Sequence, residues 1–354
     1  MGNDLQDKVA AEFRHQGQAC AQIGSALYAE LCEFVAHDIE SRGPCWSVLE
    51  SHAHLRFGLA LPLRFLGGVH RLVHLGRAPE LAEQYPSTGG TPSELLWPAF
   101  LAVLHRERAE VVAALGRDVQ TNEVVRTSAL SEGLRAIQTR TGLPISLREI
   151  GTSGGLNLRM DRFAYIDGER VGGDPASALQ IVDRWRGPVR PSFSPLNIVD
   201  RAGCDPSPID PISPEGRATL LGFLWPDQTE RNERTSAAIE IAINTPVRIE
   251  RANADSWLEA ELAHTRSGVV TVVFHSIVWQ YIDKAERERI RATLERAGQR
   301  AGLESPLAWL QFEPRQPDRS CAALTLQLWD GTTLVPTPVE LATAGFHGEW
   351  VELC

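Results

Sequence analysis

The sequence has no C-x-x-C pair, no long apolar run and no signal peptide. Its six cysteines stand singly, which is typical of reduced thiols and not of a disulfide framework or a zinc site. No apolar run approaches the roughly 18 residues that a membrane-spanning helix needs. The first residues lack the basic region and apolar core of a secretory signal. We therefore expect a cytoplasmic protein that does not bind membranes.

Basic residues are also few, because Lys and Arg number 35 against 45 Asp and Glu, for a formal net charge of −10. Binding to duplex nucleic acid needs concentrated positive charge. The chain has 354 residues, of which 43% are hydrophobic and 23% charged, as in a globular protein of about two domains. We expect a small-molecule partner and no duplex nucleic acid.

The hydrophobic pattern changes near residue 140. Before it, apolar residues recur at three- and four-residue steps, which predicts an N-terminal helical domain over residues 1–140 that caps the rest. In residues 141–354, short apolar runs alternate with amphipathic stretches, which predicts an α/β domain with a parallel sheet. The Asp167-Gly168 turn predicts a hairpin inserted around residues 163–195. The expected strands are Ile145–Ile150, Asn197–Cys204, Val247–Ala252, Val269–His275, Leu307–Phe312, Ala322–Trp329 and Trp350–Leu353, with helical stretches over Pro214–Ile243 and Lys284–Ala301.

A glycine-rich turn, Gly151 to Gly155, follows the first expected strand, which carries Glu149 near its end. Such a turn lets the backbone approach an adenosine-containing cofactor, with Glu149 placed to accept hydrogen bonds. The turn also matches G-x-S-x-G, the nucleophile elbow of α/β-hydrolases, with Ser153 as the nucleophile. That elbow normally follows several strands, whereas Ser153 follows a region expected to be helical, so we favour the cofactor. A glycine-rich turn that binds no ligand is a third alternative. The turn also lacks the G-x-G-x-x-G pattern of nicotinamide enzymes, so NAD binding is not expected.

Acidic residues also follow the second and third expected strands. Asp205 stands where a carboxylate can accept hydrogen bonds from both hydroxyls of a ribose, with Asp200 as the alternative. Asp255 stands where it could bind an adenine amino group, although an Asp there also fits a helix N-cap. Acids after three successive strands favour a nucleotide-like cofactor over three unrelated roles.

The fourth expected strand ends at His275. Histidine can act as a general base near neutral pH, and a core histidine at a strand end is the alternative. Trp279 and Tyr281 follow, and these two aromatic side chains could face a substrate or a sulfonium charge. We therefore expect His275 to be catalytic and the two aromatic residues to bind substrate.

A polar cluster of Asn122, Glu123 and Arg126 precedes the expected sheet. One alternative is that these three residues line a cleft and bind substrate or cofactor. The other is that Thr121 or Asn122 caps the helix that follows. Several histidines invite a metal interpretation, but no H-E-x-x-H motif accompanies them, so no metal site is expected. These histidines are His52, His54, His70 and His74.

Together these motifs resemble those of class I S-adenosylmethionine-dependent methyltransferases. The resemblance implies a Rossmann-like, methyltransferase-type sheet of seven strands whose last strand inserts antiparallel. It also implies that S-adenosylmethionine lies across the ends of the first four strands. The chain departs from the family pattern because Ser153 replaces the usual middle glycine and the first crossover is interrupted. The cofactor-binding residues implied are Glu149, Gly151, Ser153, Gly154, Gly155, Asp205 and Asp255.

Nearly the whole chain also resembles an uncharacterised bacterial family, domain of unknown function 2332. This resemblance implies a bacterial protein but no particular substrate. We expect a methyltransferase with a small-molecule acceptor; a serine hydrolase using Ser153 and a non-catalytic cofactor-binding scaffold or sensor are the alternatives. The matching stretches are Tyr85-Pro86-Ser87, 119–124, 149–158, Leu224-Trp225-Pro226-Asp227-Gln228 and 275–281.

Overall fold

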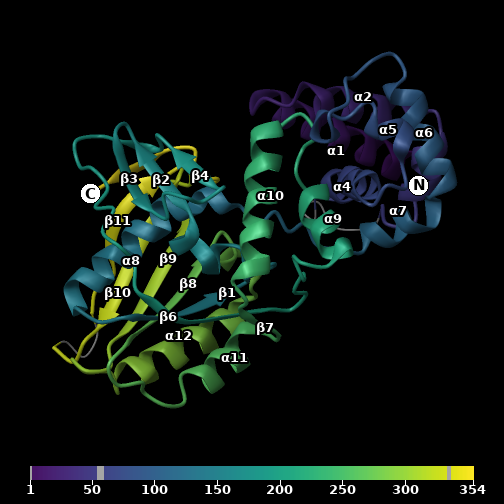
Figure 1. Cartoon of the computed structure of the whole chain (residues 1–354). Helices are drawn as coiled ribbons and strands as arrows, with labels where there is room; N and C mark the ends of the chain where they lie inside the picture. The colour runs from purple at the N-terminus through teal and green to yellow at the C-terminus, as the bar shows by residue number, and fades with distance from the viewer. Residues whose placement is uncertain (1, 54–59, 333–335) are drawn as a thin grey trace. The chain divides into compact units, whose positions relative to one another are not determined.

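The computed structural model describes residues 2–53, 60–332 and 336–354 (Figure 1). The chain forms two compact units, Met1–Thr121 with Ile209–Ser236, and Asn122–Pro208 with Ala237–Cys354. The expected boundary near residue 140 therefore falls inside the second unit, and a segment from the expected sheet half belongs to the first. No helix in the described ranges is both long enough and apolar enough to cross a membrane.

The first unit is built of helices. Phe65 is at the centre of its core, with the rings of Phe13 and Phe100 packed edge-on against it. α2 begins after Ser25, whose side chain accepts a hydrogen bond from the Tyr28 N–H, as an N-cap serine does. The helices are α1 (Gly2–Gln22), α2 (Ala26–Glu40), α3 (Pro44–Leu49), α4 (Leu61–His74), α5 (Pro79–Ala82), η1 (Pro86–Thr88), α6 (Leu96–Arg106), α7 (Arg108–Leu115), α9 (Pro214–Gly222) and the first half of α10 (Thr229–Asn244).

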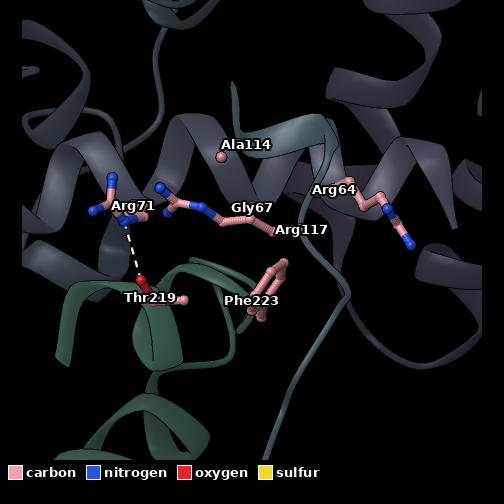
Figure 2. A pocket seen from close by; sticks show the side chains of 8 residues that line it. Arg64, Gly67, Arg71, Ala114, Arg117, Thr219 and Phe223 are labelled. Atoms are coloured by element: carbon pink, nitrogen blue, oxygen red, sulfur yellow. Dashed lines mark hydrogen bonds between the residues drawn. The ribbon is translucent and has the colours of Figure 1, made fainter. Parts of the chain in front are cut away.

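Close packing of α4 on α9 joins the segment 209–236 to the first unit. A Cβ atom on Gly67 would lie 2.9 Å from Phe223, so only glycine lets that ring approach α4. Beside it, the Arg71 Nε atom donates to the Thr219 hydroxyl oxygen at 3.0 Å (Figure 2). This tight contact requires small residues at the crossing point, a condition that the local hydrophobic pattern does not reveal.

A nine-stranded sheet lies at the centre of the second unit, in the order β5-β12-β11-β10-β9-β8-β1-β6-β7. The five strands from β9 to β7 run parallel, and β10 and β11 extend this sheet antiparallel. β1 is buried at every position, as expected for a central strand covered on both faces. The strands are β1 (Ile145–Ile150), β5 (Trp185–Arg186), β6 (Ile198–Asp205), β7 (Arg248–Arg251), β8 (Val270–Ser276), β9 (Leu307–Pro314), β10 (Ala322–Trp329), β11 (Val339–Ala344) and β12 (Val351–Leu353).

The sheet therefore has nine strands where seven were expected. All of the expected strands are present, but β5 and β11 were missed. β5 has only two residues, and β11 is mostly half-buried, so neither has a clear hydrophobic signature. The strand that pairs antiparallel with β9 is β10, and not the last strand, as the methyltransferase resemblance implied.

Helices cover both faces of the sheet. Gly133 of α8 lies against Leu310 and Leu324, whereas Trp309 and Trp329 belong to the core formed with α11 and α12. Neighbouring residues of a strand point to opposite faces, so α8 covers one face, and α11 and α12 cover the other (Figure 1). The remaining helices are η2 (Val124–Arg126), α8 (Thr127–Thr141), η3 (Asn157–Arg162), α11 (Ala254–Glu261), η4 (Trp279–Tyr281) and α12 (Lys284–Gly298).

A small three-stranded sheet interrupts the crossover between β1 and β6. Its strands β2 (Ala164–Asp167) and β3 (Arg170–Gly173) form the antiparallel hairpin that the Asp167-Gly168 turn predicts. β4 (Gln180–Val182) adds to β2 in parallel. The insertion explains the unusually long separation in sequence between the first two strands of the large sheet.

Candidate functional site

The order of the parallel strands reverses between β1 and β8. β6 and β7 follow on one side of β1, whereas β8 and β9 lie on the other. In open α/β sheets, ligands bind at the carboxyl ends of the strands beside such a reversal. The segments that follow β1 and β8 touch there, because a Cβ atom on Gly151 would lie 2.4 Å from a methyl carbon of Val278. A ligand-binding site is therefore expected at this edge of the sheet.

The glycine-rich turn is held against the end of β6. The Gly151 N–H donates to the Cys204 carbonyl oxygen at 2.9 Å, and the Ser153 N–H donates to the Asp205 carboxylate at 2.9 Å. Gly151, Ser153 and Gly155 have φ values of 67°, 51° and 67°, in the left-handed region that glycine adopts readily. Contacts within the second unit thus hold the turn in shape, and Ser153 bears backbone strain that a glycine would avoid.

Glu149 lies beside this turn with only 2% of its surface exposed. The Thr152 hydroxyl donates a hydrogen bond to its carboxyl group. Burial raises the pKa of Glu149 to about 8 and the charge of Asp205 adds to this, while the Thr152 hydrogen bond and the charges of Arg159 and Arg126 oppose it. At pH 7 Glu149 is therefore mostly a neutral carboxylic acid.

Of the two acids considered in β6, only Asp205 lies at the carboxyl end of the strand. Its two oxygens accept backbone N–H groups of Ser153 and Ser207, at 2.9 and 2.8 Å. Asp200 pairs in register with Ser146 near the start of β1 and forms an ion pair with Arg148 at 2.6 Å. Asp200 therefore belongs to a charge cluster in the sheet, and Asp205 belongs to the turn.

Asp255 occupies the first turn of α11, after β7. Asn253 takes the N-cap position that was the alternative role for Asp255. The Asp255 carboxylate accepts the Ser256 N–H at 2.7 Å and forms an ion pair with Arg289 at 2.6 Å. Partial burial opposes ionisation, but the hydrogen bond from Arg289 holds the pKa of Asp255 below its usual value. Asp255 thus links α11 to α12.

Replacing Asp255 by Asn is expected to change the free energy of unfolding by no more than about 1 kcal/mol, since exposed ion pairs contribute little. The Arg289 side chain is 57% exposed. Urea unfolding of the variant measures the change, and Arg289→Gln should give a change of the same size. A loss of several kcal/mol in both variants would contradict this estimate.

His275, the penultimate residue of β8, is fully buried and paired with Glu313 of β9. The His275 Nδ1 atom lies 2.7 Å from the Glu313 carboxylate, whose same oxygen also accepts the N–H groups of Val278 and Trp279. An oxygen that accepts two backbone N–H groups is an acceptor toward the imidazole as well, so Nδ1 carries the proton. In the neutral imidazole Nε2 is then the acceptor, and it has no hydrogen-bond partner among the described residues.

Aromatic rings surround His275. Trp279 stacks on the imidazole, with ring centroids 4.9 Å apart and an interplanar angle of 14°, and Trp309 lies 6.0 Å away. The Arg291 guanidinium lies over the Trp279 ring, 5.1 Å from its centroid. Tyr281 is 75% exposed and takes no part in this cluster. Of the two aromatic residues expected near His275, only Trp279 contacts it.

The polar cluster ahead of α8 packs against the same edge of the sheet. The Asn122 side-chain oxygen accepts the Leu156 N–H at 3.1 Å, which ties this segment to the end of the glycine-rich turn. Glu123, rather than Thr121 or Asn122, is the N-cap of η2. Arg126 donates to the Phe346 carbonyl oxygen at 2.9 Å, and it lies close enough to lower the pKa of Glu149. All three side chains are buried.

Two observations bear on the hydrolase and metal alternatives. His275 Nε2 makes no hydrogen bond, so it does not pair with the Ser153 hydroxyl in the described structure. His54 lies outside the described residues. In the ranges that are described, no three His, Cys, Asp or Glu side chains form a group that could hold a metal ion.

Sequence reasoning missed Glu313 and Thr152. Glu313 follows the expected end of the fifth strand by one residue, so it stands at the same edge of the sheet as the acids after the earlier strands. Applying the same rule to the fifth strand would have found it. Thr152 lies within the glycine-rich turn, but nothing in the local pattern shows that its hydroxyl reaches back to Glu149.

A family model described as "uncharacterized protein conserved in bacteria (DUF2332)" matches residues 10–353. The chain belongs to this family. No curated protein and no solved structure matches the chain.

Proposed function

We propose that this member of the bacterial DUF2332 family is an S-adenosylmethionine-dependent methyltransferase with a small-molecule acceptor. The observation that carries the proposal is the strand reversal between β1 and β8, with the glycine-rich turn and two buried carboxyl groups, Glu149 and Asp205, at the carboxyl ends of β1 and β6. Ligands bind at such an edge in open α/β sheets. The order β7-β6-β1-β8-β9 is also that of the parallel strands in Rossmann-like sheets.

The residues at this edge fit the cofactor in part. Asp205 retains lone pairs that can accept ribose hydroxyls, and Glu149 can donate or accept one hydrogen bond in its neutral form. The space that Cβ atoms of Gly151 and Gly155 would fill is taken by Val278 and Ile249. Those two glycines therefore shape the turn, and the cofactor would be held by side chains and by the rest of the loop.

His275 supplies the candidate general base. The cofactor, when bound, supplies a methyl group on a sulfonium, and an acceptor hydroxyl, thiol or imidazole must lose a proton as it is methylated. Glu313 accepts the hydrogen bond from the protonated His275 Nδ1 atom. Nε2 is therefore the ring nitrogen that can take the proton that the methyl acceptor loses. Because Nε2 is buried, the side chains that cover it must move when substrate enters. Asn122, Glu123 and Arg126 remain the proposed substrate contacts, and Asp255 the proposed adenine contact.

Calorimetric titration with S-adenosylmethionine and S-adenosylhomocysteine tests the proposal, with NAD as the control ligand. We expect saturable binding of the first two and none of NAD. Glu149→Ala should weaken binding by roughly 5- to 150-fold, the effect of about 1–3 kcal/mol from leaving the buried hydrogen-bond partner of Glu149 unpaired. Glu259→Ala, at an exposed acid on α11, is the matched control and should bind as the wild type does.

The outcomes separate the alternatives. Absence of binding by the folded wild-type protein would refute the methyltransferase proposal. Equal affinity in Glu149→Ala would remove Glu149 from the site and leave Asp205 as the residue to test. Binding of the cofactor with no methyl transfer to any acceptor would instead support the scaffold or sensor.

A further inference from the structure

The first unit contains a second group of polar side chains, around a pocket of about 190 Å³. Pro86 and Ser87 of the Tyr85-Pro86-Ser87 stretch line the pocket, and Asn232, which also lines it, donates to the Leu224–Gln228 segment. The proposed methyltransferase site uses neither of these two stretches of the family resemblance. Its polar lining residues come from α4, η1 and α10. They are His74, Ser87, Thr229, Asn232, Glu233 and Ser236.

Ser87 forms a hydrogen bond with a buried histidine. The Ser87 hydroxyl oxygen lies 2.8 Å from His70 Nε2, and His70 Nδ1 lies 2.9 Å from the Leu224 carbonyl oxygen. A carbonyl oxygen can only accept, so Nδ1 carries the imidazole proton and Nε2 has the lone pair. The Ser87 hydroxyl must therefore be the donor to Nε2. Burial lowers the pKa of His70, which keeps the imidazole neutral near pH 7.

This geometry is that of an activated serine. In serine enzymes a histidine accepts the hydroxyl proton, and a third group on the far ring nitrogen holds the imidazole in the required tautomer. Here the Leu224 carbonyl is that third group. His70 is held further by its contact with the His74 ring, whose centroid is 4.4 Å away. Ser87 is only partly buried and lines the pocket, so its oxygen can meet a ligand.

We propose that Ser87 is the nucleophile of a second active site, which hydrolyses small esters with His70 as the general base. The Ser87 oxygen attacks the ester carbonyl carbon while its proton passes to His70 Nε2. The bond from that carbon to the alcohol oxygen breaks, and the alcohol leaves with the proton. Water then attacks the acylated Ser87, again giving a proton to His70, so that the acid departs and Ser87 regains its hydrogen.

Two further pocket groups indicate the kind of ester. The Asn232 side-chain nitrogen donates to the carbonyl oxygens of Trp225 and Gln228, both at 3.0 Å, which leaves its oxygen as an acceptor. That oxygen and His74 Nε2 are buried and have no hydrogen-bond partner among the described residues. The Asn232 oxygen is an acceptor, whereas His74 Nε2 donates or accepts according to the tautomer of the ring, and buried polar atoms of this kind are normally satisfied by a ligand or by water. The substrate therefore carries a hydroxyl or amide N–H group beside its ester.

The site is distinct from the hydrolase alternative considered for the glycine-rich turn. That alternative uses Ser153, which lies in the other unit of the chain. A probe that reacts with activated serines separates the two residues, because each has its own alanine variant. It also separates this proposal from the methyltransferase proposal, which predicts no reaction at either serine.

Labelling of the purified full-length protein with a fluorophosphonate is the test. We expect a covalent adduct that peptide mass spectrometry of the wild type places on Ser87, so this assignment needs no variant. Ser87→Ala should abolish labelling, and His70→Gln should slow it at least tenfold. Ser41→Ala, an exposed substitution in the first unit that does not line the pocket, should label like the wild type. Labelling that disappears in Ser153→Ala would instead place the reactive serine in the glycine-rich turn. Circular dichroism establishes that each variant is folded.

Hydrolysis of p-nitrophenyl acetate gives a second readout. Release of p-nitrophenol should fall to the uncatalysed rate in Ser87→Ala and persist in Ser41→Ala. Absence of any adduct on the folded wild-type protein would overturn the proposal. An adduct on another serine, or wild-type labelling in folded Ser87→Ala, would overturn it equally.

Discussion

Glu149→Gln is expected to stabilise the protein at neutral and alkaline pH. The pKa of Glu149 rises from 4.5 to about 8 on folding, because burial disfavours its charged form. Between these pH values the folded protein holds a proton that the unfolded chain has released. Its free energy of unfolding therefore falls by up to about 1.4 kcal/mol per pH unit as the pH rises. Glutamine does not titrate, so the variant lacks this loss.

Urea unfolding at a series of pH values from 5 to 9 measures the effect. The difference between variant and wild type should grow from pH 5 to 8 and then level off, since above pH 8 both states of the wild type are deprotonated. Glu259→Gln, an exposed substitution, should give a curve parallel to that of the wild type. If the Glu149→Gln curve were parallel as well, Glu149 would have an ordinary pKa in the folded protein.

Arg148→Ala is expected to destabilise the protein by about 2–4 kcal/mol, because it removes a buried guanidinium with its ion pairs and its packing. Arg148 on β1 is 1% exposed and forms ion pairs with Asp200 at 2.6 Å and Glu261 at 2.5 Å. It joins β1 to β6 and to α11. The variant loses these bonds and leaves a cavity in the middle of the sheet.

The free energy of unfolding measured at low pH tests the same group of charged residues. Burial opposes ionisation of Asp200, but hydrogen bonds from Arg148 and Arg266 lower its pKa to about 2. This contribution to stability is present above the unfolded pKa of 3.8 and is lost as the pH falls toward 2. Arg148→Ala should shrink that acid-dependent loss, because Asp200 then loses one of its two arginine partners and keeps Arg266 and the Ser146 hydroxyl.

Arg251→Ala is the control for Arg148→Ala. Arg251 is an exposed residue of β7 whose guanidinium donates to the Pro206 carbonyl oxygen at 3.0 Å. Its loss should cost less than about 1 kcal/mol. Equal losses in the two variants would show that the ion pairs of Arg148 contribute nothing beyond an ordinary surface arginine.

The elements of the second unit could be predicted where their signal is local. β1 is a short apolar run bounded by Pro144 and by the glycine-rich turn, and its expected limits are those observed. The Asp167-Gly168 turn likewise predicts its hairpin. β11 could not be predicted, since its residues are mostly half-buried and their exposure does not alternate clearly. β5 exists as a strand only because Trp185 and Arg186 meet β12.

Predicting the candidate sites was harder, because side chains far apart in the sequence form them. The acids after the strands could be found by a rule of position, since parallel strands bring their carboxyl ends to one edge. That rule says nothing of a hydrogen bond such as the one between His275 and Glu313, or of the ion pair that engages Asp255. Such pairings depend on rotamers and on packing between elements.

The sequence by itself determined the helical and α/β textures, the glycine-rich turn and the family, because these follow from local periodicity, turn chemistry and motif spacing. Only the tertiary structure decided that residues 209–236 join the first unit and that Asp200 and Asp205 have different partners. It also brought Ser87, His70 and Leu224 together. Contacts of this range arise when helices and strands pack, so the local pattern of residues does not specify them.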